Sequence, residues 1–132
     1  MTVSVSFAQG GSDADQEMIQ GDENLADDYF FNENYKAALN QYLALLQEEP
    51  EDLKYNYNTG LCFLNSDFEK IKSIPYFEKV IFYDEEASTV YFLMGQAYQS
   101  DFQFDRAIDM FNKFLEFHDL GSEFTPDDAE LQ

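Results

Sequence analysis

Carboxylate side chains are the most abundant groups in this 132-residue sequence that could bind a cation or exchange protons. They gather in four clusters: Asp13/Asp15/Glu17, Glu48/Glu49/Glu51/Asp52, Asp84/Glu85/Glu86 and Asp127/Asp128/Glu130. The first cluster alternates acids as calcium loops do, but it lacks the glycine and the closing glutamate of an EF-hand loop. All four fall at predicted helix starts and turns, where acids stabilise the positive end of a helix. We therefore interpret them as solvated surface.

The other reactive side chains are a single cysteine, Cys62, and a single histidine, His118. One cysteine excludes an internal disulfide, and the two residues together are too few for a Cys/His metal site. His118 falls at a predicted helix C-terminus, where a cation is favoured, and Cys62 occupies a position suited to a small packed residue. The sequence also lacks a glycine-rich phosphate loop. We predict a protein that is not an enzyme and uses no cofactor or metal.

The composition indicates a folded and strongly acidic chain. Acidic residues number 27 against 7 basic ones, which gives a formal net charge of −20, while 45% of the residues are hydrophobic. This apolar content suits one domain with its own core. The charge repels phosphate backbones and anionic lipids, so nucleic-acid binding and docking on a membrane surface are not expected. No stretch approaches the ~20 apolar residues of a transmembrane helix, so we expect no direct membrane insertion.

Apolar residues recur at three- and four-residue spacing from Gln16 onward, which predicts an all-α fold. The predicted helices span 16–31, 34–48, 53–65, 69–83, 87–99 and 104–118. Breakers separate them, among them Pro50 and the sequence Asn65-Ser66-Asp67.

The two ends of the sequence differ from this helical middle. Residues 1–15 are small, polar and acidic, which predicts a disordered lead-in, and Ser6-Phe7-Ala8 also resembles the end of a trimmed export signal. Near the other end, Thr125 and Pro126 form a typical helix start. We therefore expect residues 122–132 to begin a capping helix that is cut short, as in a piece of a longer protein.

Small and aromatic residues repeat along the predicted helices at matched intervals. Small residues stand at Ala26, Gly60 and Gly95, spaced 34 and 35 residues apart, and rings follow three positions later at Tyr29, Phe63 and Tyr98. In the next helices, small residues stand at Ala38, Ser73 and Ala107, with rings four positions later at Tyr42, Phe77 and Phe111. Antiparallel helices pack closely where a small residue leaves a notch that a neighbouring ring fills. Three stacked helix pairs are expected to share one core.

This pattern resembles the tetratricopeptide repeat, whose helix pairs combine small and aromatic residues and close at a proline. The resemblance covers residues ~19–121 of a repeat domain predicted at 16–121, in units of about 19–52, 53–87 and 88–121, and Pro50 closes the first. The second unit departs from the pattern by one net extra residue in its turn. The resemblance implies an α–α superhelix of three helix hairpins, with the C-terminal segment as a truncated or capping helix.

In the architecture that this resemblance implies, the first helix of each pair lines a concave groove for a protein or peptide partner. By register, the main groove residues are Glu23, Asp27, Phe30, Tyr57, Leu61, Leu64, Phe92 and Gln96, and the wider set adds Gln20, Phe31, Lys54, Asn65, Thr89 and Gln99. The middle is apolar and aromatic, as in binding hot spots, and the first-unit end is acidic. We expect an extended or helical segment to dock there, with its basic residues near Glu23 and Asp27. Two alternatives stay open: a register shifted by one residue, and a groove covered by the chain's own termini.

Some tetratricopeptide proteins hold a C-terminal carboxylate in this groove with lysine and asparagine side chains. The corresponding positions here are Glu23, Asp27, Asn58, Thr89 and Leu93. Only Asn58 fits that role, and the two acids would repel a carboxylate. A carboxylate clamp is therefore not expected.

The last helix of the third unit has no following unit to cover it. Its apolar face is expected to present Ile108, Phe111, Leu115 and Phe114, whereas repeat arrays normally end in a polar cap. We expect either that residues 126–132 pack onto this face or that the chain forms a homo-oligomer through it.

Two long stretches and the C-terminal sequence TPDDAELQ extend the resemblance beyond the generic repeat. Residues 56–81 and 90–117 are similar to the N-terminal repeat region of large envelope proteins of Gram-negative gliding bacteria, which also contain an OmpA-like peptidoglycan-binding domain. This resemblance implies a periplasmic or outer-membrane-associated scaffold, with partners in outer-membrane anchoring, gliding or type IX secretion. The alternatives are a structural module that self-associates and a cytosolic, chaperone-like adaptor.

Overall fold

The structure is a computed structural model that describes residues 20–67 and 69–118, and within these ranges it is all-helical without a β-strand. The α-helices are α2 (Glu23–Phe31), α3 (Tyr35–Glu48), α4 (Leu53–Leu64), α5 (Ile74–Tyr83), α6 (Ser88–Ser100) and α7 (Phe104–His118), and a short 3₁₀ helix, η1 (Lys70–Ser73), precedes α5. The predicted all-α class is confirmed for this part of the chain. The predicted lead-in at 1–15 and the predicted helix start at Thr125 lie outside the described residues.

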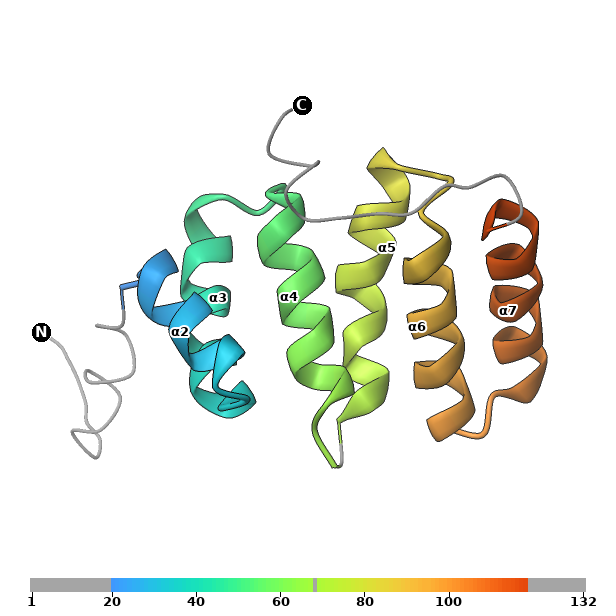
Figure 1. Ribbon diagram of the computed structural model, residues 1–132, viewed down its shortest axis with the longest axis horizontal. Helices are drawn as coiled ribbons and strands as arrows, with labels where there is room; N and C mark the ends of the chain where they lie inside the picture. The colour runs from blue at the N-terminus through green and yellow to red at the C-terminus, as the bar shows by residue number, and fades with distance from the viewer. Residues whose placement is uncertain (1–19, 68, 119–132) are drawn as a thin grey trace, which may run out of the picture.

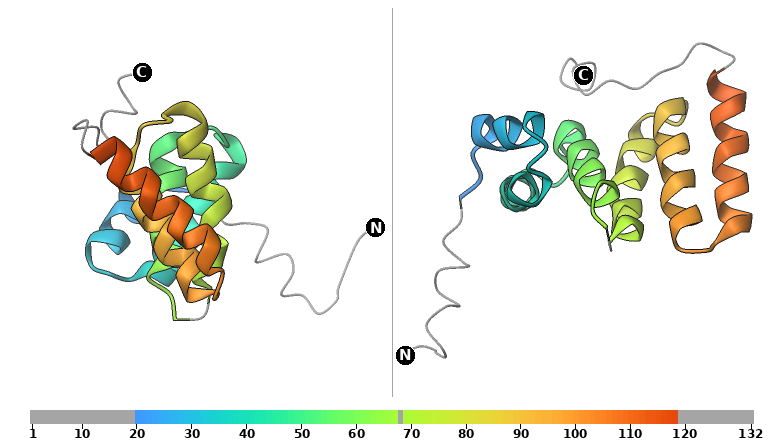
Figure 2. Two further views of the ribbon diagram at one scale, coloured as in Figure 1. Left: turned by 90° about the vertical axis from the view of Figure 1, so that its right-hand side faces the viewer. Right: turned by 60° about the horizontal axis from the view of Figure 1, so that its bottom comes forward.

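The helices stand in a row in chain order, from α2 at one end to α7 at the other (Figure 1). Consecutive helices run in opposite directions, and each packs against the next. Seen along the row, they overlap as one stack (Figure 2, left). Alternate helices are neighbours as well, because Lys54 of α4 binds Glu23 of α2, and Leu61 of α4 and Leu93 of α6 line one depression. The packing is therefore repeat-like.

Polar side chains fix the starts of three helices. Asp22, Asn34 and Asp52 each accept a hydrogen bond from the backbone N–H three residues later, at 3.0, 3.4 and 2.9 Å. Such caps satisfy backbone donors that have no partner inside the helix. The cap at Asp22 places the start of α2 at Glu23. The prediction of a helix from residue 16 is therefore wrong at 20–22, which are not helical, and 16–19 lie outside the described residues.

The helix predicted over 69–83 is divided in two. Its first turn is the 3₁₀ helix η1, and α5 begins at Ile74 with Pro75 in its first turn, where the missing N–H costs no hydrogen bond. Lys70 of η1 turns back onto the end of α4 and donates from Nζ to the carbonyl oxygens of Leu64 (2.9 Å) and Ser66 (2.6 Å). This division lies in the turn where the sequence shows one extra residue.

Glycines of the repeat lie where rings of the following helix approach the backbone. A Cβ atom placed on Gly60 would lie only 2.5 Å from Cε1 of Phe77, and one placed on Gly95 would overlap the ring of Phe111. Ala107, the small residue of α7, is buried as well. Gly60 and Gly95 are thus notches filled by rings, as predicted, and the structure identifies these rings as Phe77 and Phe111. Each pair holds consecutive helices at close distance.

The turns after α2 and after α6 share a backbone feature. Glu33 and Phe102 both have φ of 60°, in the left-handed region that residues other than glycine rarely adopt. They are 69 residues apart (102 − 33), and Ala26 and Gly95 have the same separation (95 − 26). The first and third helix pairs therefore reverse direction at the same position of the repeat.

In the described part of the chain, most of the buried apolar side chains form two hydrophobic clusters. The first centres on Tyr42, which packs with Ala26, Ala38, Tyr55 and Cys62. The second centres on Phe77 and continues through Val80, Val90, Met94, Ala97 and Ala107. The first cluster joins α2, α3 and α4, and the second joins α5, α6 and α7.

Candidate functional site

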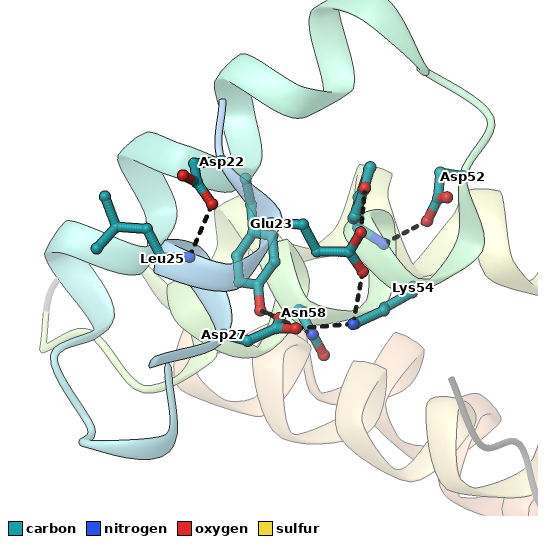
Figure 3. A network of polar contacts seen from close by, with 9 residues as sticks. Asp22, Glu23, Leu25, Asp27, Asp52, Lys54 and Asn58 are labelled. Carbon is teal, nitrogen blue, oxygen red and sulfur yellow. Dashed lines mark hydrogen bonds and ion pairs between the residues drawn. The ribbon is translucent and has the colours of Figure 1, made fainter. Parts of the chain in front are cut away.

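The acidic end of the predicted groove contains an internal ion-pair network. The ammonium group of Lys54 lies between two carboxylates of α2, 2.8 Å from Glu23 Oε2 and 2.9 Å from Asp27 Oδ2 (Figure 3). The hydroxyl of Tyr55 also donates to Glu23 Oε1 at 3.0 Å. Burial lowers the pKa of Lys54, but the hydrogen bonds to Glu23 and Asp27 outweigh it and raise this pKa above its ordinary value. The lysine therefore stays charged and ties α4 to α2.

Tyr42 links this network to the core. Its hydroxyl donates to Asp27 Oδ1 at 2.6 Å and accepts from Asn58 Nδ2 at 3.1 Å. Burial, and then the hydrogen bond to Asp27, raise the pKa of this fully buried tyrosine. The phenol thus remains a donor at neutral pH. Asn58, the one residue that by sequence fits a carboxylate clamp, is buried and bonded to Tyr42.

These contacts change the expectation for Glu23 and Asp27. We expected the two acids to meet basic residues of a partner, but Lys54 already supplies a cation between them. The sequence could not show this, because the lysine lies 31 and 27 residues away from them. Their charge is used inside the protein, to join the first and second helix pairs.

The three aromatic residues of the main predicted groove set, Phe30, Tyr57 and Phe92, pack against other rings, and Phe31 of the wider set is 82% exposed. Phe30 is half-buried and meets Tyr42 edge-on, with ring centres 6.3 Å apart. Tyr57 is half-buried against Phe77 at 6.2 Å. Phe92 of α6 lies 5.6 and 5.2 Å from the rings of Phe111 and Phe114 of α7. These aromatic side chains contribute to packing between helices, so they are poor positions at which to test binding.

An open depression of about 470 Å³ lies between α4 and α6. Leu61 and Leu64 of α4 and Leu93 of α6 supply its apolar part. Of the main groove residues predicted from sequence, Leu61, Leu64 and Gln96 line it, and Asn65 and Gln99 of the wider set join them. These predicted residues thus lie together around one depression, and Leu93 lines it in place of its neighbour Phe92.

Polar side chains surround the leucines of this depression. Asn65, Gln96 and Gln99 provide amides, and Ser100 provides a hydroxyl. Lys70, from η1, is the one charged residue that residues 20–67 and 69–118 contribute to the lining, and its ammonium group donates to two backbone carbonyl groups. Sequence analysis missed Lys70 and Ser100. The extra residue in the second turn was the only signal that the chain there departs from the regular repeat.

A second, smaller depression of about 260 Å³ shares Lys70 and Ser100 with the first. It adds Ile71 and two aspartates, Asp67 and Asp101, from the turns that follow α4 and α6. Both aspartates are exposed, and among residues 20–67 and 69–118 neither forms an ion pair. The apolar pocket between α4 and α6 and this acidic depression are therefore adjacent, because both are lined by Lys70 and Ser100.

Several acidic residues outside this surface have local structural partners. Asp52 caps α4, and Glu51 accepts hydrogen bonds from Lys79 and Tyr83. Its bonds to Lys79 and then Tyr83 lower the pKa of Glu51. These contacts agree with the interpretation of the second cluster as surface at a helix start. The clusters at 13–17 and 127–130 lie outside the described residues.

Cys62, the only cysteine, is buried in the first core cluster. Burial raises the pKa of its thiol to about 12. The thiol is therefore protonated at neutral pH and acts as a packing group, because the thiolate is the nucleophile and metal ligand.

The helix α7 ends the row (Figure 2, left), and some of its apolar side chains are exposed. Ile108 is 55% exposed and Leu115 is 54% exposed, whereas Phe111 and Phe114 are half-buried. The prediction of an uncovered apolar face is confirmed for Ile108 and Leu115. Among the described helices, none has the length and apolarity needed to cross a membrane.

No protein-family model matches the chain, and no curated protein matches it.

Proposed function

We propose that this chain is a non-catalytic protein-interaction module that binds a partner segment in the depression between α4 and α6. Three features support a tetratricopeptide superhelix of three hairpins as its architecture. Rings fill glycine notches at Gly60 and Gly95, the left-handed turn residue recurs at one repeat position, and alternate helices share one face. The observation that carries the binding function is the open pocket of leucines within a rim of amides.

The chemistry of this pocket suits a peptide. Leu61, Leu64 and Leu93 can bury one large apolar side chain, which supplies most of the free energy of such contacts. The side-chain amides of Gln96 and Gln99 both donate and accept hydrogen bonds, as a peptide backbone does. Since Gln96 and Gln99 are exposed, a ligand can reach both without displacing core residues.

Selection from a displayed random-peptide library tests this proposal. Gln96→Tyr places a ring at the mouth of the pocket, and Gln47→Tyr adds the same ring at an exposed position of α3. We expect peptides selected on the native protein to bind the Gln96→Tyr variant at least about tenfold more weakly, equivalent to about 1.4 kcal/mol. Binding to the Gln47→Tyr variant should be unchanged. Peptides that tolerate a ring at position 96 would show that the pocket is not the binding site.

The resemblance to envelope proteins of gliding bacteria supports a location for this module. We propose the periplasm or the periplasmic face of the outer membrane, with envelope proteins of anchoring, gliding or secretion assemblies as partners. A cytosolic adaptor is the alternative. Fractionation of the native cells, with the chain detected by antibody, distinguishes the two locations.

Self-association is a second candidate function, because α7 exposes Ile108 and Leu115 on one helix face. Isolated apolar residues are common on surfaces, but these lie one above another at the end of the row. If copies join through this face, light scattering should show dimers at high concentration, and Ile108→Asp with Leu115→Asp should return the chain to monomers. A protein that is monomeric at every concentration excludes this candidate.

A further inference from the structure

We infer that the partner segment is basic, with a lysine or arginine close to the apolar side chain that enters the leucine pocket. This inference rests on the proposed function, since it specifies the partner of the same surface. Among the described residues, the lining of the pocket contains no carboxylate, whereas that of the adjoining depression contains Asp67 and Asp101. A segment that crosses from one to the other therefore meets an apolar site and then an acidic one.

The charges of this surface favour a cation at that place. Asp67 and Asp101 are exposed, and no cation in the described ranges pairs with either of them. Lys70 lies in the lining of both depressions, but its ammonium group is turned onto the carbonyl oxygens of Leu64 and Ser66. Two carboxylates against one lysine leave the smaller depression net negative. The chain as a whole has a net charge of −20, which attracts basic partners from a distance.

The other acidic end of the same face does not offer an equivalent site. Glu23 and Asp27 already hold Lys54 at 2.8 and 2.9 Å. A basic partner residue there would have to compete with this partly buried lysine. The cation of the partner is therefore assigned to the Asp67 and Asp101 end of the face.

An exposed ring follows one of the two aspartates in the chain. Phe102 directly follows Asp101, is 79% exposed and meets Phe104 at a ring-centre distance of 6.1 Å. The methylene chain of a lysine or arginine can lie on such a ring while its charged group reaches a carboxylate. Phe102 also has a left-handed backbone conformation, which is unfavourable for a residue with a large side chain. Its ring is exposed to water as well, which is unfavourable for an apolar group. A partner that covers the ring would offset its exposure.

The same peptide selection, repeated on a variant, tests the inference. In Asp67→Asn with Asp101→Asn both carboxylates become amides of nearly equal size. The control variant, Glu48→Gln with Glu78→Gln, makes the same change in net charge at exposed positions of α3 and α5. We expect peptides selected on the native protein to contain lysine or arginine near a large apolar residue. Their affinity should fall about three- to tenfold on the Asp67 and Asp101 variant and stay unchanged on the control.

The outcomes separate the two proposals. Peptides that depend on the pocket, as judged by Gln96→Tyr, but bind both charge variants equally well would overturn the basic partner and leave the binding function standing. Equal losses on both charge variants would also overturn it, because they indicate general attraction to an acidic protein. If no selected peptide is sensitive to Gln96→Tyr, the binding site itself is refuted, and this inference is refuted with it.

Discussion

Phe77→Ala is expected to lower the free energy of unfolding by about 3–5 kcal/mol, which is typical for loss of a fully buried ring. Phe77 is 0% exposed and lies at the centre of the second core cluster. The ring occupies the notch at Gly60 of α4 and contacts Tyr57, which also lies in α4. Because it joins α5 to α4, its removal leaves a cavity between two helices. Urea denaturation followed by far-UV circular dichroism measures the loss.

The same helix supplies a matched control for this prediction. Phe82 of α5 is 74% exposed, so Phe82→Ala should change the free energy of unfolding by no more than about 0.5 kcal/mol.

The variant Gly60→Ala tests the notch from the side of α4. A methyl group there meets a ring that has no room to move, and we expect a cost of about 1–3 kcal/mol, although alanine ordinarily stabilises a helix relative to glycine. In the Phe77→Ala background this cost should disappear. Additive losses, or equal effects of Phe77→Ala and Phe82→Ala, would contradict the notch.

Lys54→Met should be the most destabilising change among the lysines with described ion pairs. The substitution keeps an unbranched side chain but leaves the carboxylates of Glu23 and Asp27 together without the ammonium group between them. Breaking a fully buried pair costs about 3–5 kcal/mol; because the Glu23 and Asp27 side chains are 40% and 25% exposed, we expect about 1–3 kcal/mol. Thermal and urea denaturation at neutral pH measure this loss.

Lys79→Met is the control for the lysine prediction. Lys79 also pairs with a glutamate, Glu51, at 2.6 Å, but both side chains are well exposed. Exposed pairs contribute little, so this variant should lose much less stability than Lys54→Met. Removing one acid with Glu23→Gln should reduce the cost of Lys54→Met, because fewer unpaired charges remain. Equal losses for the two lysines would show that the network around Lys54 does not join the helix pairs.

The parts of the fold that follow from spacing along one helix could be predicted from sequence. Notches at small residues depend on residue size at fixed intervals, and Gly60 and Gly95 are such notches, filled in the structure by Phe77 and Phe111. The helix 104–118 was predicted with the bounds that α7 has, since its turn and its apolar periodicity are regular. Regular spacing also puts Leu61 and Leu64 on one face of a helix, and with Gln96 they line one depression in the structure.

The parts that depend on contacts between helix pairs could not be predicted. Helical periodicity gives the direction of a side chain only to within a fraction of a turn, and long aromatic side chains can reach a neighbouring helix from such a position. Phe92 therefore packs onto α7 while Leu93 lines the pocket. The position of Lys54 between two acids of another helix pair has no local signal either. The 3₁₀ turn at Lys70 arises from one extra residue, whose placement the sequence left undefined.

The burial of Cys62 has a practical consequence for experiments on this surface. Because Cys62 is the only cysteine and is 2% exposed with a protonated thiol, maleimide reagents will leave it unmodified in the folded protein. A cysteine introduced at Gln99, which is exposed at the rim of the leucine pocket, would then be the single point of labelling. A fluorophore attached there would report occupancy of the pocket directly, in a protein that retains its native core.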